Sequence, residues 1–205
     1  MTISYAILID GGFARHKLGS AKRQAISDDF NVLIEKIKKL PDLQSCRLHR
    51  VYYYDAMPLT SFEKMPLQGG KVDFGKTSIV THTKQLYREL AKLPFVSLRI
   101  GEVTFNGWGV YPRILENASG PELTIKSGDL KAQIKQNGVD MRIGMDIAAL
   151  TLKKHVKIIV LVASDSDFVP AIKFARREGC QLYLCTLGHG VKPVMLEHCD
   201  LLLEV

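Results

Sequence analysis

The 205-residue sequence is poor in cysteine and has no cysteine pair at metal-binding or redox spacing. Its four cysteines, Cys46, Cys180, Cys185 and Cys199, form no C-x-x-C motif. A disulfide framework and a zinc site of the usual spacing are therefore not expected. Reduced thiols in a cytoplasmic protein are the simplest interpretation of this cysteine usage.

The sequence also lacks a long hydrophobic run. No segment approaches about 18 uninterrupted apolar residues. The first ten residues carry no basic segment of the kind that begins a secretory signal. We therefore expect a cytoplasmic protein with no membrane partner. Internal repeats and low-complexity segments are absent too, which leaves a single domain over residues 1–205 as the simplest organisation.

The overall composition is that of an ordinary globular protein. Hydrophobic residues make up 46% of the chain and charged residues 24%, which is enough apolar material for a packed core. The formal net charge is +7, and the sequence pI is about 9.2. This basic balance favours a polyanionic partner, although it also affects solubility and nonspecific binding.

Apolar runs and amphipathic segments alternate along the chain. We expect strands at residues 4–9, 47–54, 95–105, 157–163, 181–187 and 200–205, and helices at 30–40, 81–93, 139–153 and 169–178, with a short helix before the last strand. Strands that alternate with helices at this spacing imply βαβ crossovers. The expected fold is therefore α/β, a three-layer α/β/α sandwich with a mostly parallel, Rossmann-like sheet.

Two segments do not follow this alternation. Residues 56–80 are richer in Gly, Pro and Lys and have little periodicity, so we expect a surface loop. Residues 106–138 contain NGWG, NASGP and SGD, which indicate a hairpin-like excursion at one edge of the sheet.

Aspartates follow two of the expected buried strands. Asp10 ends the first strand, and Asp165 and Asp167 follow strand 157–163. Ligands of parallel sheets bind beyond the carboxyl ends of the strands, so these carboxylates meet in one cleft if the two strands are neighbours. Their mutual repulsion then favours a divalent cation. Helix capping is an alternative for Asp165 or Asp167, whereas no clear helix start follows Asp10.

Two further aspartates belong to the expected helix at 139–153. Asp140 falls in its first turn, and Asp146 lies six residues later. Six residues correspond to about 600° of helix rotation, which leaves the two side chains about 120° apart. They do not share a face. Asp140 is the better candidate for a site at the helix start, and Asp146 is either a second ligand or solvated surface.

Four segments resemble an NYN domain of the LabA-like type, in the PIN-like nuclease superfamily. They are the IDG motif after the first strand, the strand end YYYDA, the helix GVDMRIGMDIAAL, and VLVASDSDFVPAIKFARREGCQLYL. The resemblance implies an α/β/α sandwich whose acidic residues bind Mg²⁺ or Mn²⁺. It assigns catalysis and metal binding to Asp10, Asp140, Asp165 and Asp167, and it also places Asp146 on a family aspartate.

The resemblance and the residue chemistry together predict a metal-dependent nuclease. Its substrate is RNA, or single-stranded DNA, cleaved by a water that Mg²⁺ or Mn²⁺ activates, and endonucleolytic action is favoured. The alternative is a noncatalytic nucleic-acid-binding or regulatory module, because Gly12 and Phe13 stand where many relatives carry a polar residue. The sequence leaves the oligomeric state open and is compatible with a homo-oligomer.

Basic and aromatic residues near the aspartates are candidates for nucleic-acid contacts. Solvated surface charge and ordinary packing are the alternatives. The candidates are Arg15, Lys17, Lys22, Arg23, Lys131, Lys135 and Trp108. His189 and Lys192 follow strand 181–187, where a connecting turn is the favoured interpretation.

A competing motif lies at residues 70–77. The segment GKVDFGKT satisfies the P-loop pattern, in which Lys76 would hold phosphates and Thr77 a magnesium ion. A P-loop leaves a buried strand directly, and the residues before Gly70 do not have the pattern of one. This context argues against a nucleotide site.

Overall fold

The computed structural model describes residues 2–20 and 22–205. The contacts of the chain divide it into two compact units. Unit 1 consists of Met1–Asp55, Leu86–Ile100 and Gly138–Val205, and unit 2 of Ala56–Gln85 and Gly101–Asn137.

Unit 1 is built on a mostly parallel sheet. Its strands are β1 (Ser4–Asp10), β2 (Arg47–Ala56), β7 (Ile158–Val162), β8 (Gln181–Cys185), β9 (Leu201–Leu203) and the first residues of β5 (Val96–Val110). The order of these strands is β5-β2-β1-β7-β8-β9. β1 pairs in parallel with both β2 and β7. It is buried on both faces because its residues from Tyr5 to Ile9 are all apolar.

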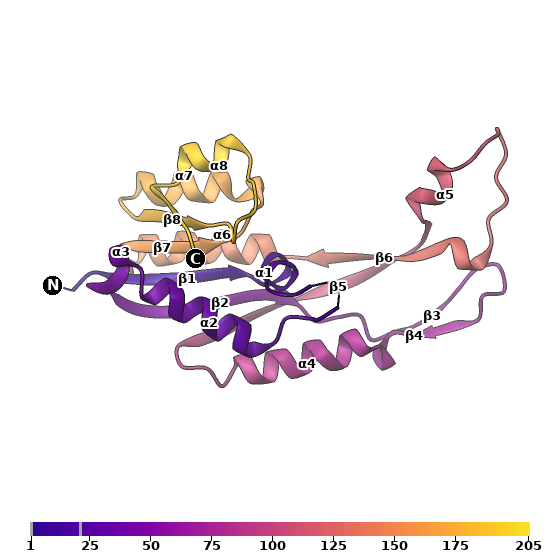
Figure 1. Cartoon of the computed structure of the whole chain (residues 1–205), viewed down its shortest axis with the longest axis horizontal. Coiled ribbons are helices and arrows are strands. Elements are labelled where there is room, and N and C mark those ends of the chain that lie inside the picture. The colour runs from indigo at the N-terminus through magenta and orange to yellow at the C-terminus, as the bar shows by residue number, and fades with distance from the viewer. Residues whose placement is uncertain (1, 21) are drawn as a thin grey trace. The chain divides into compact units, whose positions relative to one another are not determined.

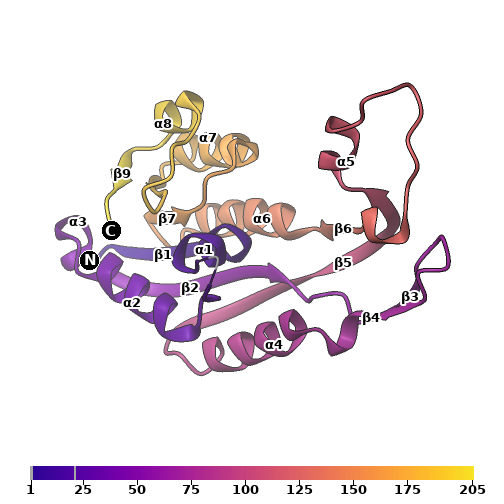
Figure 2. The same ribbon diagram turned by 45° about the vertical axis from the view of Figure 1, so that its right-hand side comes forward.

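Helices cover both faces of the unit 1 sheet. They are α1 (Gly11–Leu18), α2 (Ser27–Lys38), α3 (Pro41–Gln44), α6 (Val139–Leu152), α7 (Val169–Arg177), α8 (Pro193–His198) and the end of α4 (Ser78–Leu90). Consecutive residues of β2 point to opposite faces. The Tyr53 ring meets Phe30 of α2 edge-on, and the Tyr54 hydroxyl donates to Asp146 of α6. Figures 1 and 2 show α2 and α6 on opposite sides of β1 and β2. The expected three-layer α/β/α sandwich is confirmed.

The helix α2 shows why these layers hold together. Its apolar residues recur every three or four positions, so Phe30, Leu33, Ile34 and Ile37 are all buried. Each contributes about 1.5–3 kcal/mol relative to exposure to water. No helix in the described part of the chain is long and apolar enough to cross a membrane.

The helix α1 corrects one interpretation of the sequence. No helix start was expected after Asp10, yet α1 begins at Gly11, and the Asp10 carboxylate accepts a hydrogen bond from the Phe13 amide at 3.2 Å. Two glycines hid this start because glycine disfavours helices. Gly11 is required there, since a Cβ would lie 2.6 Å from the Tyr54 carbonyl oxygen.

Unit 2 is mostly antiparallel. The far part of β5 pairs with β6 (Leu130–Asn137), and β3 (Phe62–Lys64) pairs with β4 (Lys71–Asp73). The short helix α5 (Pro112–Glu116) and the 3-10 turn η2 (Ser127–Asp129) connect β5 to β6. The expected hairpin-like excursion is thus the β5–β6 pair and its connection.

The segment 56–80 differs from the surface loop that the sequence suggested. It contains β3, β4, the 3-10 turn η1 (Phe74–Lys76) and the start of α4. Strands of three residues are too short to produce a detectable alternation.

Candidate active site

Two of the aspartates lie at the carboxyl edge of adjacent strands. Asp10 ends β1, and Asp165 follows β7 by three residues. The two strands pair in parallel, with Ile9 opposite Val162. The condition that the sequence left open, that these strands be neighbours, is therefore met.

The other two aspartates reach this edge from helical elements. Asp140 lies in the first turn of α6, and Asp167 lies in the 3-10 turn η3 (Ser166–Phe168), which packs against α6. Burial raises the pKa of Asp140, and the nearby charges of Asp165 and Asp167 raise it further. Asp140 in turn acts on Asp10. The four aspartates are thus one electrostatically coupled group, which we call the acid cluster.

Asp10 is the most strongly perturbed member of the acid cluster. Burial raises its pKa from 3.8 to about 6, and the carboxylates of Asp140 and Asp55 add to the effect. The amides of Phe13 and Gly12 oppose it by hydrogen bonding to the charged form. A bound cation would relieve the repulsion between this half-buried carboxyl and its acidic neighbours.

Asp10→Asn is expected to stabilise the metal-free protein at pH 7 by about 1–2 kcal/mol. Because folding raises this pKa, the stabilising contribution of Asp10 is complete below about pH 4 and is lost as the pH rises through about 6. An asparagine oxygen still accepts from the Phe13 amide. Thermal unfolding in chelator from pH 4 to pH 7 measures the difference in stability between the variant and wild type. A variant that is no more stable than wild type at pH 7 would contradict the expectation.

Asp165 combines two roles that the sequence presented as alternatives. Its carboxylate accepts a hydrogen bond from the Asp167 amide at 2.9 Å and caps η3. Both aspartates are nevertheless exposed, and both act on Asp140. Capping uses one oxygen of a carboxylate, so the second oxygen remains available for a ligand.

Asp55 is a member of this edge to which the sequence analysis gave no role. It is 1% exposed, forms an ion pair with Arg15 at 2.9 Å, and accepts from the Tyr53 hydroxyl at 2.9 Å. The signal was present in the strand end YYYDA. Since Asp10 lies opposite Tyr54, the next residue of β2 falls just beyond the end of β1.

Asp146 is held in a separate set of contacts. Its carboxylate accepts from the Arg99 guanidinium at 3.1 Å and from the Tyr54 hydroxyl at 2.8 Å. These partners come from β5 and β2, and neither is a member of the acid cluster. The arrangement gives Asp146 a role in joining α6 to the sheet.

The basic candidates of the first helix are partly occupied by acidic partners. Arg15 faces Asp55, and Arg23 pairs with Asp29 at 2.7 Å. Lys17 lies in the last turn of α1, and Lys22 is exposed after it. Lys17 and Lys22 therefore remain the candidates of this segment for phosphate contacts.

The remaining candidates belong to unit 2. The Trp108 ring packs against Phe74 and Phe105, and its indole N–H donates to the Lys64 carbonyl oxygen at 3.0 Å. Lys131 and Lys135 are four residues apart on β6, so they share one face of the strand. Trp108 thus packs within unit 2, whereas the two lysines line one polar face.

The loop after β8 also reaches the carboxyl edge of the sheet. Lys192 donates to the Ser166 hydroxyl at 2.9 Å, between Asp165 and Asp167 in sequence. The His189 ring lies 6.0 Å from the Phe13 ring, measured between centroids. Lys192 therefore brings a positive charge to the acid cluster.

The P-loop-like segment at 70–77 has its own partners. The Asp73 carboxylate accepts from the Gly75 amide at 3.0 Å and lies 3.6 Å from Lys76. The Thr77 hydroxyl donates to the Phe74 carbonyl oxygen at 2.7 Å. The preceding strand is a three-residue antiparallel strand of unit 2. The segment therefore lacks the buried parallel strand that a P-loop requires.

The donor chemistry of the acid cluster fits a hard divalent cation. Mg²⁺ and Mn²⁺ prefer carboxylate oxygens. Among the described residues, no three His, Cys, Asp or Glu side chains converge closely enough to hold an ion alone. Mg²⁺, however, usually keeps several waters and binds through one or two carboxylates plus substrate phosphates. The cluster fits such a partly hydrated ion and does not form a closed cage.

Comparisons with known proteins agree with this fold. The NYN domain family matches residues 106–203, which supports an NYN domain in this chain. A protein of unknown function from Vibrio parahaemolyticus has a similar crystal structure, with a TM-score of 0.52 and 12% identity, over 98% of this chain and 92% of that one. No curated protein matches. NYN domains belong to the PIN-like nuclease superfamily, whose members generally use divalent metals.

Proposed function

We propose that this protein is a metal-dependent ribonuclease that hydrolyses phosphodiesters at the acid cluster. The observation that carries the proposal is the coupling of Asp10, Asp140, Asp165 and Asp167 at the carboxyl edge of a parallel sheet. Such a group repels phosphate unless a cation is present. The nuclease-type domain match and the net charge of +7 support nucleic acid as the substrate.

The aspartates of the acid cluster and Lys192 would have different roles in this reaction. Asp10 and Asp165 would hold Mg²⁺ or Mn²⁺ from adjacent strand ends, and Asp140 and Asp167 from α6 and η3. The bound ion would supply polarisation of the phosphodiester and a lowered pKa of the attacking water. Lys192 offers a positive charge to the phosphate beside Ser166. Asp146 is left out of this ligand set because Arg99 and Tyr54 already hold it.

The second candidate function is a noncatalytic nucleic-acid-binding module. One observation favours it: the residue three positions after Asp10 is Phe13, whose ring lies beside His189. A polar side chain in that place could position a water or a phosphate, and an aromatic ring cannot. This alternative predicts binding of RNA without turnover.

Calorimetric titration with Mn²⁺ tests the proposed ligand set. Asp10→Asn and Asp165→Asn are each expected to weaken binding by about tenfold or more, because each removes a charged ligand from a different strand end. Asp28→Asn, an exposed change in the first turn of α2, is the control. Asp146→Asn is expected to retain binding. Wild-type affinity in both cluster variants would refute the assignment.

A further inference from the structure

An apolar groove begins at the acid cluster and runs between two helices. α6 and α7 pack side by side, as both ribbon views show. The groove between them has a volume of about 510 Å³ and is walled by Met141, Met145 and Phe174. Met141 is 68% exposed and Met145 64% exposed. Because methionine side chains are flexible, the two exposed methionines and the Phe174 ring form an apolar surface that can adapt to a flat ligand.

Small residues keep the bottom of the groove open. Gly144 of α6 faces Ala171 of α7, and a Cβ built on Gly144 would lie 3.9 Å from the Ala171 Cβ. That distance is an ordinary van der Waals contact. A larger side chain at position 144 would therefore extend into the groove without a backbone clash, so this glycine determines how much space the groove offers.

Asp140 and Asp167, which belong to the acid cluster, line the groove where α6 and α7 begin. An occupant must therefore be apolar along its length and tolerate, or donate to, carboxylates at one end. A phosphate or a second acidic group does not fit this charge pattern. A nucleobase does, because its faces are apolar and the exocyclic amino groups of adenine, guanine and cytosine donate hydrogen bonds.

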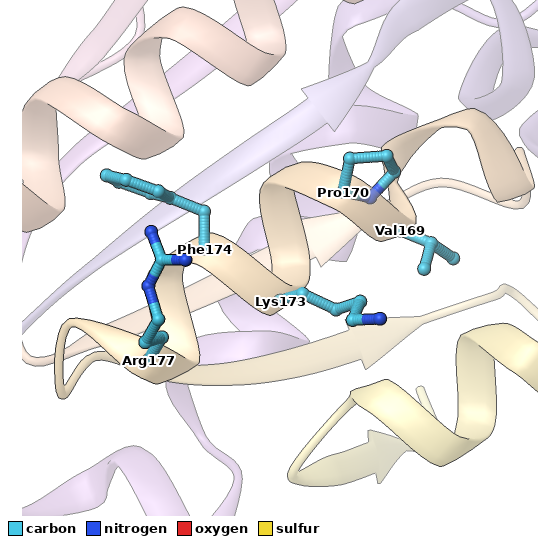
Figure 3. Close-up of a pocket in the computed structure, with 5 residues that line it drawn as sticks. All are labelled: Val169, Pro170, Lys173, Phe174 and Arg177. Carbon is cyan, nitrogen blue, oxygen red and sulfur yellow. The ribbon is translucent and has the colours of Figure 1, made fainter.

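The exposed side of α7 supplies positive charge next to the groove. Lys173 and Arg177 line a neighbouring cavity of about 620 Å³, which shares Pro170 and Phe174 with the groove. Figure 3 shows the Arg177 guanidinium beside the Phe174 ring and the Lys173 side chain extending away from that ring. The Arg177 Cζ lies 5.4 Å from the Phe174 ring centroid. Phosphates on either side of a bound base could thus meet a cation.

We propose that the α6–α7 groove is the subsite for one nucleobase, preferably a purine, next to the scissile phosphodiester, and that Lys173 and Arg177 bind the flanking backbone. The proposal rests on the proposed nuclease function for the location of the scissile bond. The size of the groove favours a purine, since a larger ring gains more contact with Phe174 and the two methionines.

Filling the groove tests the base subsite. Binding of short single-stranded oligonucleotides of adenylate and of uridylate is measured by fluorescence anisotropy with Ca²⁺ in place of Mg²⁺ or Mn²⁺, so that a cation neutralises the acid cluster, and the same samples are checked for intact oligonucleotide. Wild type is expected to prefer adenylate. Gly144→Leu is expected to lower the affinity for adenylate by about tenfold and to abolish the preference. Asn31→Leu, which adds a leucine to the exposed face of α2, is the control.

Removing the cations tests the backbone contacts. The double variant Lys173→Gln with Arg177→Gln is expected to weaken both oligonucleotides equally and to reduce the salt dependence of binding by about two ion equivalents. Lys36→Gln with Lys39→Gln removes the same charge from exposed positions of α2 and its end, and should leave binding unchanged. Equal losses in both double variants would overturn this part of the proposal.

The outcomes separate the subsite from the nuclease function. Gly144→Ala is a second variant in case Gly144→Leu does not fold. Alanine has a higher helix propensity than glycine, and its methyl group still narrows the groove. Wild-type affinity and base preference in both folded Gly144 variants would overturn the subsite, whether or not RNA is cleaved. Loss of the adenylate preference in a protein that cleaves nothing would uphold the subsite and refute the nuclease.

Discussion

Asp165→Asn is expected to lower the rate of RNA cleavage by about a hundredfold or more while RNA affinity stays close to wild type. Asp165 is exposed three residues after the entirely apolar strand β7 and acts on Asp140. Replacing its charge weakens the hold on a cation, yet the asparagine oxygen can still accept the Asp167 amide that caps η3. This substitution is therefore expected to impair catalysis without disturbing the fold.

The measurement is a single-turnover cleavage assay with Mg²⁺ and with Mn²⁺, beside anisotropy on the same RNA. Asp28→Asn is the control, because it removes one exposed carboxylate from α2. Cleavage by the variant at the wild-type rate would rule out Asp165 as part of the catalytic machinery. Absence of cleavage by wild type on every RNA and DNA tested, with binding retained, would favour the noncatalytic module.

Asp55→Ala is expected to lower the free energy of unfolding by about 3 kcal/mol or more. Asp55 is 1% exposed and is the acceptor for both Arg15 and Tyr53. Removing it deprives Arg15, Tyr53 and Tyr87 of a buried carboxylate, and it also removes a like charge near Asp10. The first effect is larger because Arg15 faces Asp55 in a largely buried setting.

Urea unfolding of the metal-free protein measures this loss. Asp28→Ala, at an exposed position, should change stability by less than about 0.5 kcal/mol. The double variant Arg15→Met with Asp55→Leu should recover much of the loss, because apolar replacement of a buried ion pair avoids leaving one charge behind. A loss below about 1 kcal/mol in Asp55→Ala would show that the Arg15–Asp55 pair contributes little.

The stability and activity predictions distinguish two kinds of acidic residue at one sheet edge. Asp55 has its charge balanced by Arg15. Burial and neighbouring carboxylates raise the pKa values of Asp10 and Asp140, so the protein does not balance their negative charge. Unbalanced acids destabilise the metal-free fold and become useful only when a cation binds.

The sequence alone predicted the fold class and named the four aspartates of the acid cluster as candidates. Continuous apolar runs such as β1 and β7, separated by amphipathic helices such as α7, have only one common solution, a parallel sheet covered on both faces. Asp10 and Asp165 could be placed at its carboxyl edge because a strand end is visible in the sequence. Apolar strands, amphipathic helices and aspartates at strand ends each involve residues that are close in the sequence, so a sequence pattern can reveal them.

Only the tertiary structure decided which residues meet. That β1 lies beside β7 follows from strand order, and the pairing of Asp55 with Arg15 and of Asp146 with Arg99 joins residues far apart in the chain. The sequence did not reveal the helix after Asp10, because glycine has a low helix propensity. Gly11 is needed at that position because β2 approaches it too closely for a side chain. Contacts of this kind depend on how whole helices and strands pack together, so the hydrophobic periodicity of a single element cannot predict them.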